Sequence, residues 1–139
     1  MIIVALKESE LHEKRVAITP EIAKKYISSG HQVMIEADAG KESGYFNSTY
    51  EQHGVNVEKN RQLIFEKADI ILTTAPLDLN QAPNIKKGAL LIGLLKPHKN
   101  QEHLSLLAER GVTSFSLELL PRITRAQTMD VLSSQSNLA

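Results

Sequence analysis

Short apolar runs alternate with stretches of helical spacing along this chain, and the alternation restricts its possible folds more than any other feature. Runs rich in β-branched residues predict six strands, at residues 2–6, 31–37, 54–57, 68–74, 89–95 and 112–117. Helical patterns between most of these runs are typical of a parallel sheet with helices on both faces. We therefore predict an α/β fold, a flavodoxin-like or Rossmann-like three-layer sandwich with a mainly parallel sheet.

Helices are expected in four of the intervening stretches. The first has the clearest end signals, because Thr19 can cap it, Pro20 suits the first helical position and Gly30 can close it. The others are expected at residues 48–53, 61–67 and 101–110. Residues 75–88 contain two prolines and a glycine and are expected to form a loop.

Composition excludes several classes of function. A length of 139 residues suits one globular domain, and 16 basic residues balance 16 acidic ones, so nothing favours binding to nucleic acid or an anionic membrane. The absence of cysteine excludes a disulfide framework, a thiolate zinc site and a cysteine nucleophile. No apolar run approaches the ~18 residues of a membrane span, so direct membrane insertion is not expected.

An α/β chain could bind a dinucleotide, but the glycine pattern that this requires is missing. Dinucleotide binding uses a G-x-G-x-x-G turn between a strand and a helix, where backbone can approach the pyrophosphate. The seven glycines do not form that turn, nor do they form a phosphate-binding G-x-x-x-x-G-K-[ST] loop. The chain therefore lacks the usual nucleotide cradle.

Candidate site residues follow the predicted strands, because α/β sheets place their sites at the carboxyl ends of the strands. Arg15 could clamp a carboxylate or phosphate there, or could belong to a solvated charged loop. His98 could act as an acid or base, but no partner carboxylate is evident, and we leave it out of the site. We expect Arg15, Thr73, Lys96 and Arg122 to lie along one edge of the domain and to face a common cleft.

The segment "PRITRAQTMD" (121–130) allows a structural and a functional interpretation. Thr124 and Gln127 have the spacing of a capping box, and a negative charge at Asp130 suits the first turns of a helix. Capping does not explain Arg122, since a cation is not favoured at a helix start. Asp130 could hold Arg122 in a fixed pose for recognition of a planar polar ligand.

The stretches "KRVAITP", "GYFNSTYEQHG" and "ADIILTTAP" occur in an order that resembles one known family. This family is the N-terminal domain shared by alanine dehydrogenases and the alpha subunit of proton-translocating NAD(P) transhydrogenases. The ending "PRITRAQTMDVLSSQSNLA" resembles the transhydrogenase branch. The resemblance implies that Arg122 contacts NAD(H), that Asp130 steadies Arg122 and that Gln127 reaches toward the partner's NADP(H). Thr124 and Met129 belong to the same implied cofactor-binding set.

The resemblance also implies a division of labour between domains. Residues 1–125 would form the N-terminal lobe and residues 126–139 the start of an interdomain helix, while the glycine-rich lobe that holds most of NAD(H) would be missing, as in a truncated, split or excised product. Implied partners are the NADP(H)-binding and membrane subunits, with a homodimer in the intact subunit. The expected location is cytoplasmic, peripheral to the inner membrane through those partners, and the fragment is not expected to be active alone.

Two departures from the alanine dehydrogenase pattern bear on the choice of activity. Alanine dehydrogenases bind and protonate the oxo-acid with a lysine and a histidine, and this chain has Thr73 and Lys96 at the matched positions. Arg15 is retained, and without those partners a structural role for it is the better interpretation. The alternatives are an alanine dehydrogenase-like lobe and a non-catalytic module that binds a protein partner.

Overall fold

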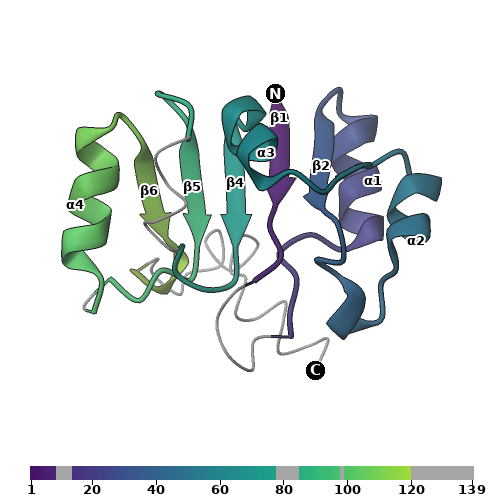
Figure 1. Cartoon of the computed structure of the whole chain (residues 1–139), viewed down its shortest axis with the longest axis horizontal. Coiled ribbons are helices and arrows are strands. Elements are labelled where there is room, and N and C mark those ends of the chain that lie inside the picture. Colours follow the sequence, from purple (N-terminus) through teal and green to yellow (C-terminus); the bar gives the residue numbers. More distant parts are fainter. Residues whose placement is uncertain (9–13, 78–84, 98, 120–139) are drawn as a thin grey trace.

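Six parallel strands form a single sheet through the centre of the chain (Figure 1). The computed structural model describes residues 1–8, 14–77, 85–97 and 99–119. The strands are β1 (Ile2–Ala5), β2 (Gln32–Glu36), β3 (Asn56–Glu58), β4 (Ile70–Thr73), β5 (Leu90–Gly93) and β6 (Thr113–Ser116). Every predicted strand is present, and each neighbouring pair is parallel.

The strand order identifies the type of α/β sheet. It runs β3-β2-β1-β4-β5-β6, which is the Rossmann order rather than the flavodoxin order. The α/β prediction is confirmed, and the sheet is wholly parallel. The order reverses between β1 and β4, so the switch point lies between these two strands.

The helices begin and end close to the predicted positions. They are α1 (Pro20–Ser28), α2 (Asn47–Gln52), α3 (Arg61–Lys67) and α4 (Gln101–Glu109), with short 3₁₀ turns η1 (Lys41–Ser43) and η3 (Leu117–Leu119). Thr19 caps α1 as predicted, since its hydroxyl accepts a hydrogen bond from the Ile22 N–H at 3.3 Å. Asn60 caps α3 in the same way, at 3.0 Å from the Gln62 nitrogen.

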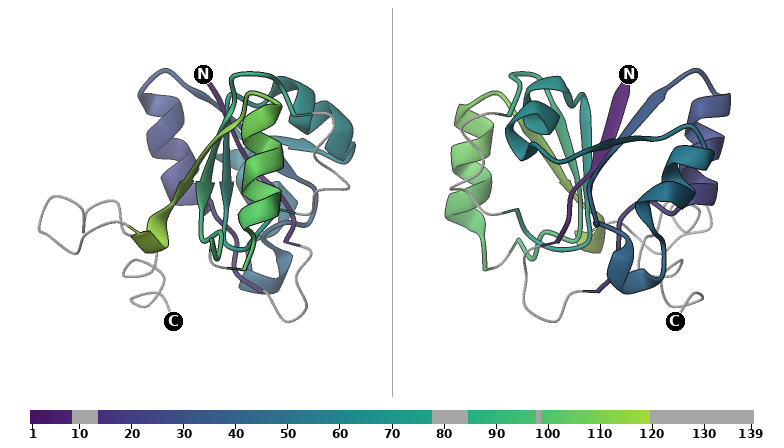
Figure 2. Two further views of the ribbon diagram at one scale, coloured as in Figure 1. Left: turned by 90° about the vertical axis from the view of Figure 1, so that its left-hand side faces the viewer. Right: turned by 45° about the vertical axis from the view of Figure 1, so that its right-hand side comes forward.

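The sheet separates two hydrophobic cores. On one face, α1 and α2 bury Ile18, Ala23 and Tyr50 against β1 and β2, and the Tyr50 hydroxyl donates to the Ile18 carbonyl at 2.7 Å. On the other face, Phe65 of α3 and Leu107 of α4 pack against the strands. Figure 2 shows α1 and α4 on opposite sides of the sheet.

Asp69 joins three strands at the edge of the sheet where the strands begin. Its carboxylate accepts a hydrogen bond from the Ile2 N–H at 2.8 Å and pairs with the ammonium group of Lys86. Its own N–H donates to the Ile2 carbonyl, and its carbonyl accepts from the Leu90 N–H, both at 2.9 Å. The hydrogen bond from Lys86, followed by that from Ile2, lowers the pKa of Asp69 below its ordinary value.

Candidate functional site

All six strands end at the same edge of the sheet, which we call the carboxyl edge (Figure 1). Arg15 lies in the segment after β1, Thr73 ends β4 and Lys96 follows β5, so these three predicted residues belong to segments at this edge. Arg15 is exposed, and the Lys14 carbonyl beside it accepts a hydrogen bond from Ser43 of η1 at 2.5 Å. The placement of Arg122 remains a prediction, because it lies outside the described residues.

Glu8 bridges the switch point between β1 and β4. Its carboxylate oxygen Oε1 accepts a hydrogen bond from the Thr74 N–H at 2.8 Å, across the gap where the strand order reverses. In a dinucleotide-binding sheet, glycine backbone after β1 approaches the pyrophosphate at this position. A carboxylate repels phosphate groups, so the described residues of this crevice do not fit a dinucleotide pyrophosphate.

Thr73 and Thr74 place two buried hydroxyl groups next to Glu8. Each residue is only 3% exposed, and neither hydroxyl has a hydrogen-bond partner among the described residues. A buried hydroxyl without a partner is costly, so each is a candidate to bind a water molecule or a polar ligand group. These hydroxyls can donate and accept hydrogen bonds, but they offer no positive charge.

Gly93 of β5 makes room for Thr73. The two residues lie side by side on neighbouring strands. A Cβ atom at Gly93 would stand 2.2 Å from the Thr73 carbonyl oxygen and 2.3 Å from its hydroxyl oxygen. Only glycine fits such a close approach, so β4 and β5 fix the position of the Thr73 side chain.

Lys96 lies beyond the end of β5 in an unusual backbone conformation. Its φ of 47° falls in the left-handed region that favours glycine. The carboxylate of Glu118 accepts a hydrogen bond from the Lys96 N–H at 2.8 Å and another from the Ser116 hydroxyl at 3.2 Å. Glu118 thus ties the ends of β5 and β6 together and holds the Lys96 backbone.

A third carboxylate orders the other half of the edge. Glu36, the last residue of β2, receives a two-pronged hydrogen bond from Arg61, with distances of 2.9 Å from Nε and 2.6 Å from Nη2. Glu36 also accepts from the Lys7 N–H at 2.7 Å, and Arg61 donates to the Lys7 carbonyl at 2.6 Å. This arrangement fixes the segment that carries Glu8. The sequence contained no signal for it, since Glu36 and Arg61 lie 25 positions apart.

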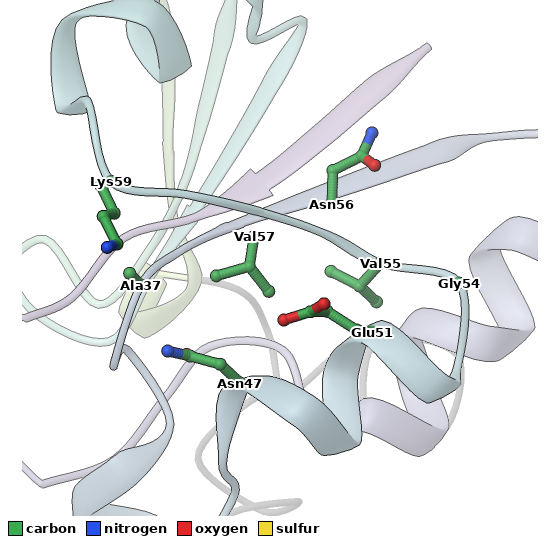
Figure 3. Close-up of a pocket in the computed structure, with 8 residues that line it drawn as sticks. All are labelled: Ala37, Asn47, Glu51, Gly54, Val55, Asn56, Val57 and Lys59. Atoms are coloured by element: carbon green, nitrogen blue, oxygen red, sulfur yellow. The ribbon is translucent and has the colours of Figure 1, made fainter.

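An open groove of about 550 Å³ lies away from the switch point, beside the edge strand β3 (Figure 3). Figure 3 shows Asn47 and Glu51 of α2 beneath Val57 of β3, with Lys59 at one end. The groove therefore presents an amide and charges of both signs. None of the predicted site residues lines it.

Several predicted residues fall outside the part of the chain that the structure describes. These are the implied cofactor-binding residues Arg122, Thr124, Gln127, Met129 and Asp130, together with His98. The described residues contain no group of three or more histidine, aspartate or glutamate side chains that could hold a metal ion. Across the same residues, no helix has the length and apolar character needed to cross a membrane.

Comparisons with known proteins identify relatives along the whole length of the chain. A family model described as "Alanine dehydrogenase/PNT, N-terminal domain" matches residues 4–139. An NAD(P) transhydrogenase alpha subunit of Rickettsia prowazekii is 42% identical over 142 aligned residues, covering 99% of this chain and 37% of the relative. Alanine dehydrogenase 1 of Staphylococcus aureus is 29% identical, covering 96% of this chain and 36% of the relative.

A solved structure supports the same relationship. The transhydrogenase from Sinorhizobium meliloti superposes with a TM-score of 0.91 at 40% identity, covering 99% of this chain and 41% of that one. The fold is therefore shared over almost every residue. The chain spans little more than a third of the length of the curated relatives described above.

Proposed function

The chain belongs to the alanine dehydrogenase/PNT family through its N-terminal domain, and we propose that it serves as the first lobe of the NAD(H)-binding component of a proton-translocating NAD(P) transhydrogenase. The reaction would be hydride transfer between NADH and NADP⁺. Hydride transfer is the chemistry of the cofactors, and the protein supplies binding and alignment. On this proposal the lobe is inactive alone.

Thr73 is the observation that carries the choice of the transhydrogenase branch. At the position where alanine dehydrogenases have a substrate-binding lysine, this chain has a buried, neutral hydroxyl held against Gly93. No ammonium group is available there to bind an oxo-acid. The greater identity to a transhydrogenase subunit than to an alanine dehydrogenase, 42% against 29%, supports the same choice.

The proposed nucleotide contacts come from residues 122–130. Arg122 contacts NAD(H), Asp130 holds Arg122, and Gln127 reaches toward NADP(H) on the partner, with Thr124 and Met129 in the same loop. These roles follow from the resemblance of the segment to the family pattern, and Glu8 gives indirect support. Because Glu8 disfavours a pyrophosphate at the switch point, most of the NAD(H) contacts must come from another lobe.

The proposal also names partners and a location. The lobe would work with a glycine-rich NAD(H)-binding lobe, with the NADP(H)-binding and membrane subunits, and as part of a homodimer. It would lie in the cytoplasm, peripheral to the inner membrane through those subunits. Support comes from the names of the relatives, which include an NAD(P) transhydrogenase alpha subunit.

A chimera tests the proposed activity. This chain would replace the aligned N-terminal segment of the Rickettsia prowazekii relative, and the product would be combined with the remaining transhydrogenase subunits. We expect hydride transfer from NADH to an NADP⁺ analogue and no alanine-dependent reduction of NAD⁺. The unmodified relative is the control for assembly.

Each alternative predicts a different result from the same chimera. Alanine-dependent NADH formation would favour an alanine dehydrogenase-like lobe. A folded, assembled chimera without either activity would favour a module that binds a protein partner.

A further inference from the structure

An apolar area remains open on the face of the sheet that carries α1. Leu90 and Ile92 of β5 point to this face beside Phe115 of β6, and we call these three residues the β5–β6 face. Leu90 and Ile92 are half-buried but belong to neither core, and Phe115 is 51% exposed. Ile70 and Leu72 of β4 border the area and pack against the α1 core.

The opposite face of the same strands is covered. Leu91 of β5 is 1% exposed and belongs to the core that contains Leu107 of α4. Figure 2 shows α4 on that side, whereas among the described elements α1 lies farther along the sheet, over β1 and β2. Parallel sheets are normally buried on both faces, so the β5–β6 face has the character of a surface that another element covers.

We propose that residues 126–139 of this chain form a helix that packs on the β5–β6 face. The described chain leaves β6 through η3 and stops at Leu119, at the carboxyl edge next to this face. In an α/β fold the segment after a strand returns along the sheet, and α4 already occupies the other side of β5 and β6. The β5–β6 face is the one left for the next element.

The sequence of this segment suits the proposal. Thr124 and Gln127 can form a capping box at its start, and Met129 and Leu132 share one side of a helix because they are three positions apart. A helix of 14 residues would be about 21 Å long. A strand of four residues spans about 13 Å, so the helix could cover β5 and β6 along their length.

Connectivity favours this segment over a second copy or a separate partner. Only residues 120–125 separate it from the described chain, and a short connection gives an effective concentration in the millimolar range. A separate molecule would have to compete with that concentration. The proposal does not depend on the function proposed above.

Cross-linking between introduced cysteines tests the proposal in the full chain, which has no cysteine of its own. The test protein carries Phe115→Cys and Leu132→Cys. The control carries Leu106→Cys and Leu132→Cys, because Leu106 is similarly exposed, at 40%, but lies on α4 on the opposite side of the sheet. With a short bifunctional maleimide, we expect the test pair to form an intramolecular cross-link at least about tenfold faster than the control pair.

The other cross-linking outcomes contradict the proposal. Equal rates, or a faster control pair, would mean that the segment does not lie on the β5–β6 face. Cross-linked dimers as the main product of the Phe115 pair would mean that a second copy occupies the face. Circular dichroism of each variant checks that the strands and helices are retained.

Hydrogen exchange gives a second, independent measurement. Leu132→Asp should remove the apolar contact and speed exchange of the β5 and β6 amides by about fivefold or more, while β1 and β2 keep their rates. Ser134→Asp adds the same charge on the other side of the helix, since residues two apart do not share a side, and should leave the rates unchanged. Unaltered exchange in the Leu132 variant would overturn the proposal.

Discussion

Lys96 is a residue whose backbone conformation, rather than its side chain, determines which substitutions it tolerates. Its φ of 47° is strained for most residues, and most of all for β-branched ones. We expect Lys96→Val to be less stable than Lys96→Gly by about 1 kcal/mol, because only glycine adopts this conformation without a steric cost. Urea unfolding of both variants measures the difference. Both lose the lysine side chain, so equal stabilities would contradict the explanation.

Gln127 separates the capping and nucleotide-binding interpretations of the segment after β6. Glutamate fills the capping-box position as well as glutamine does, so Gln127→Glu should leave the melting temperature nearly unchanged. If the residue faces the partner's nucleotide, the carboxylate should slow hydride transfer by at least about tenfold, or ~1.4 kcal/mol. Single-turnover transfer in the assembled chimera measures this. An unchanged rate would favour capping alone.

Single residues were the least predictable part of the carboxyl edge. The sequence pointed to Thr73 and Lys96 because they follow predicted strands. It could not reveal that Glu8 accepts from Thr74, 66 positions away, or that Glu36 binds Arg61. These contacts depend on which strands are neighbours, and that order is a property of the folded sheet.

Elements were predicted more fully than residues. Helix α3 has the expected bounds, and α2 and α4 differ from expectation by one residue at an end, because apolar periodicity and capping residues are local signals. The order of the strands was left open between two types of sheet. Pairing of β1 with β4 joins residues nearly 70 positions apart, and no local pattern encodes it.

The junction of β1, β4 and the start of β5 gives a pH-dependent prediction. The pKa of Asp69 is lowered below its ordinary value of 3.8, mainly by Lys86, so its contribution to stability is present above that value. The contribution is lost as the pH falls through the lowered pKa of the folded state. We expect Asp69→Asn to be less stable than the native chain at pH 6, with the difference shrinking below about pH 4.

Denaturant unfolding of both chains at pH 6 and pH 3 measures this difference. Asparagine has nearly the same shape and can still accept from the Ile2 N–H, so the comparison isolates the charge. Asp38→Asn is the control for removing a carboxylate elsewhere. A stability difference between the native chain and Asp69→Asn that stays constant with pH would show that the charge of Asp69 is unimportant.

The whole molecule offers few groups that could hold a dinucleotide. It has no glycine-rich turn, and Glu8 lies where the pyrophosphate would approach. We expect very weak NADH binding by this 139-residue chain, because only the contacts of residues 122–130 would be available. Isothermal calorimetry measures the affinity. A sub-micromolar dissociation constant would contradict the view that another lobe supplies most of the binding energy.

The parallel sheet also determines how the chain can be handled on a surface. Met1 is 65% exposed and stands at the amino end of β1, so it lies at the opposite edge from Glu8, Thr73 and Lys96 (Figure 1). An affinity tag or a biotin at the amino terminus would therefore immobilise the chain with its carboxyl edge pointing outward. In a biosensor, analytes flowing past would meet the edge that carries the candidate site, unobstructed by the attachment.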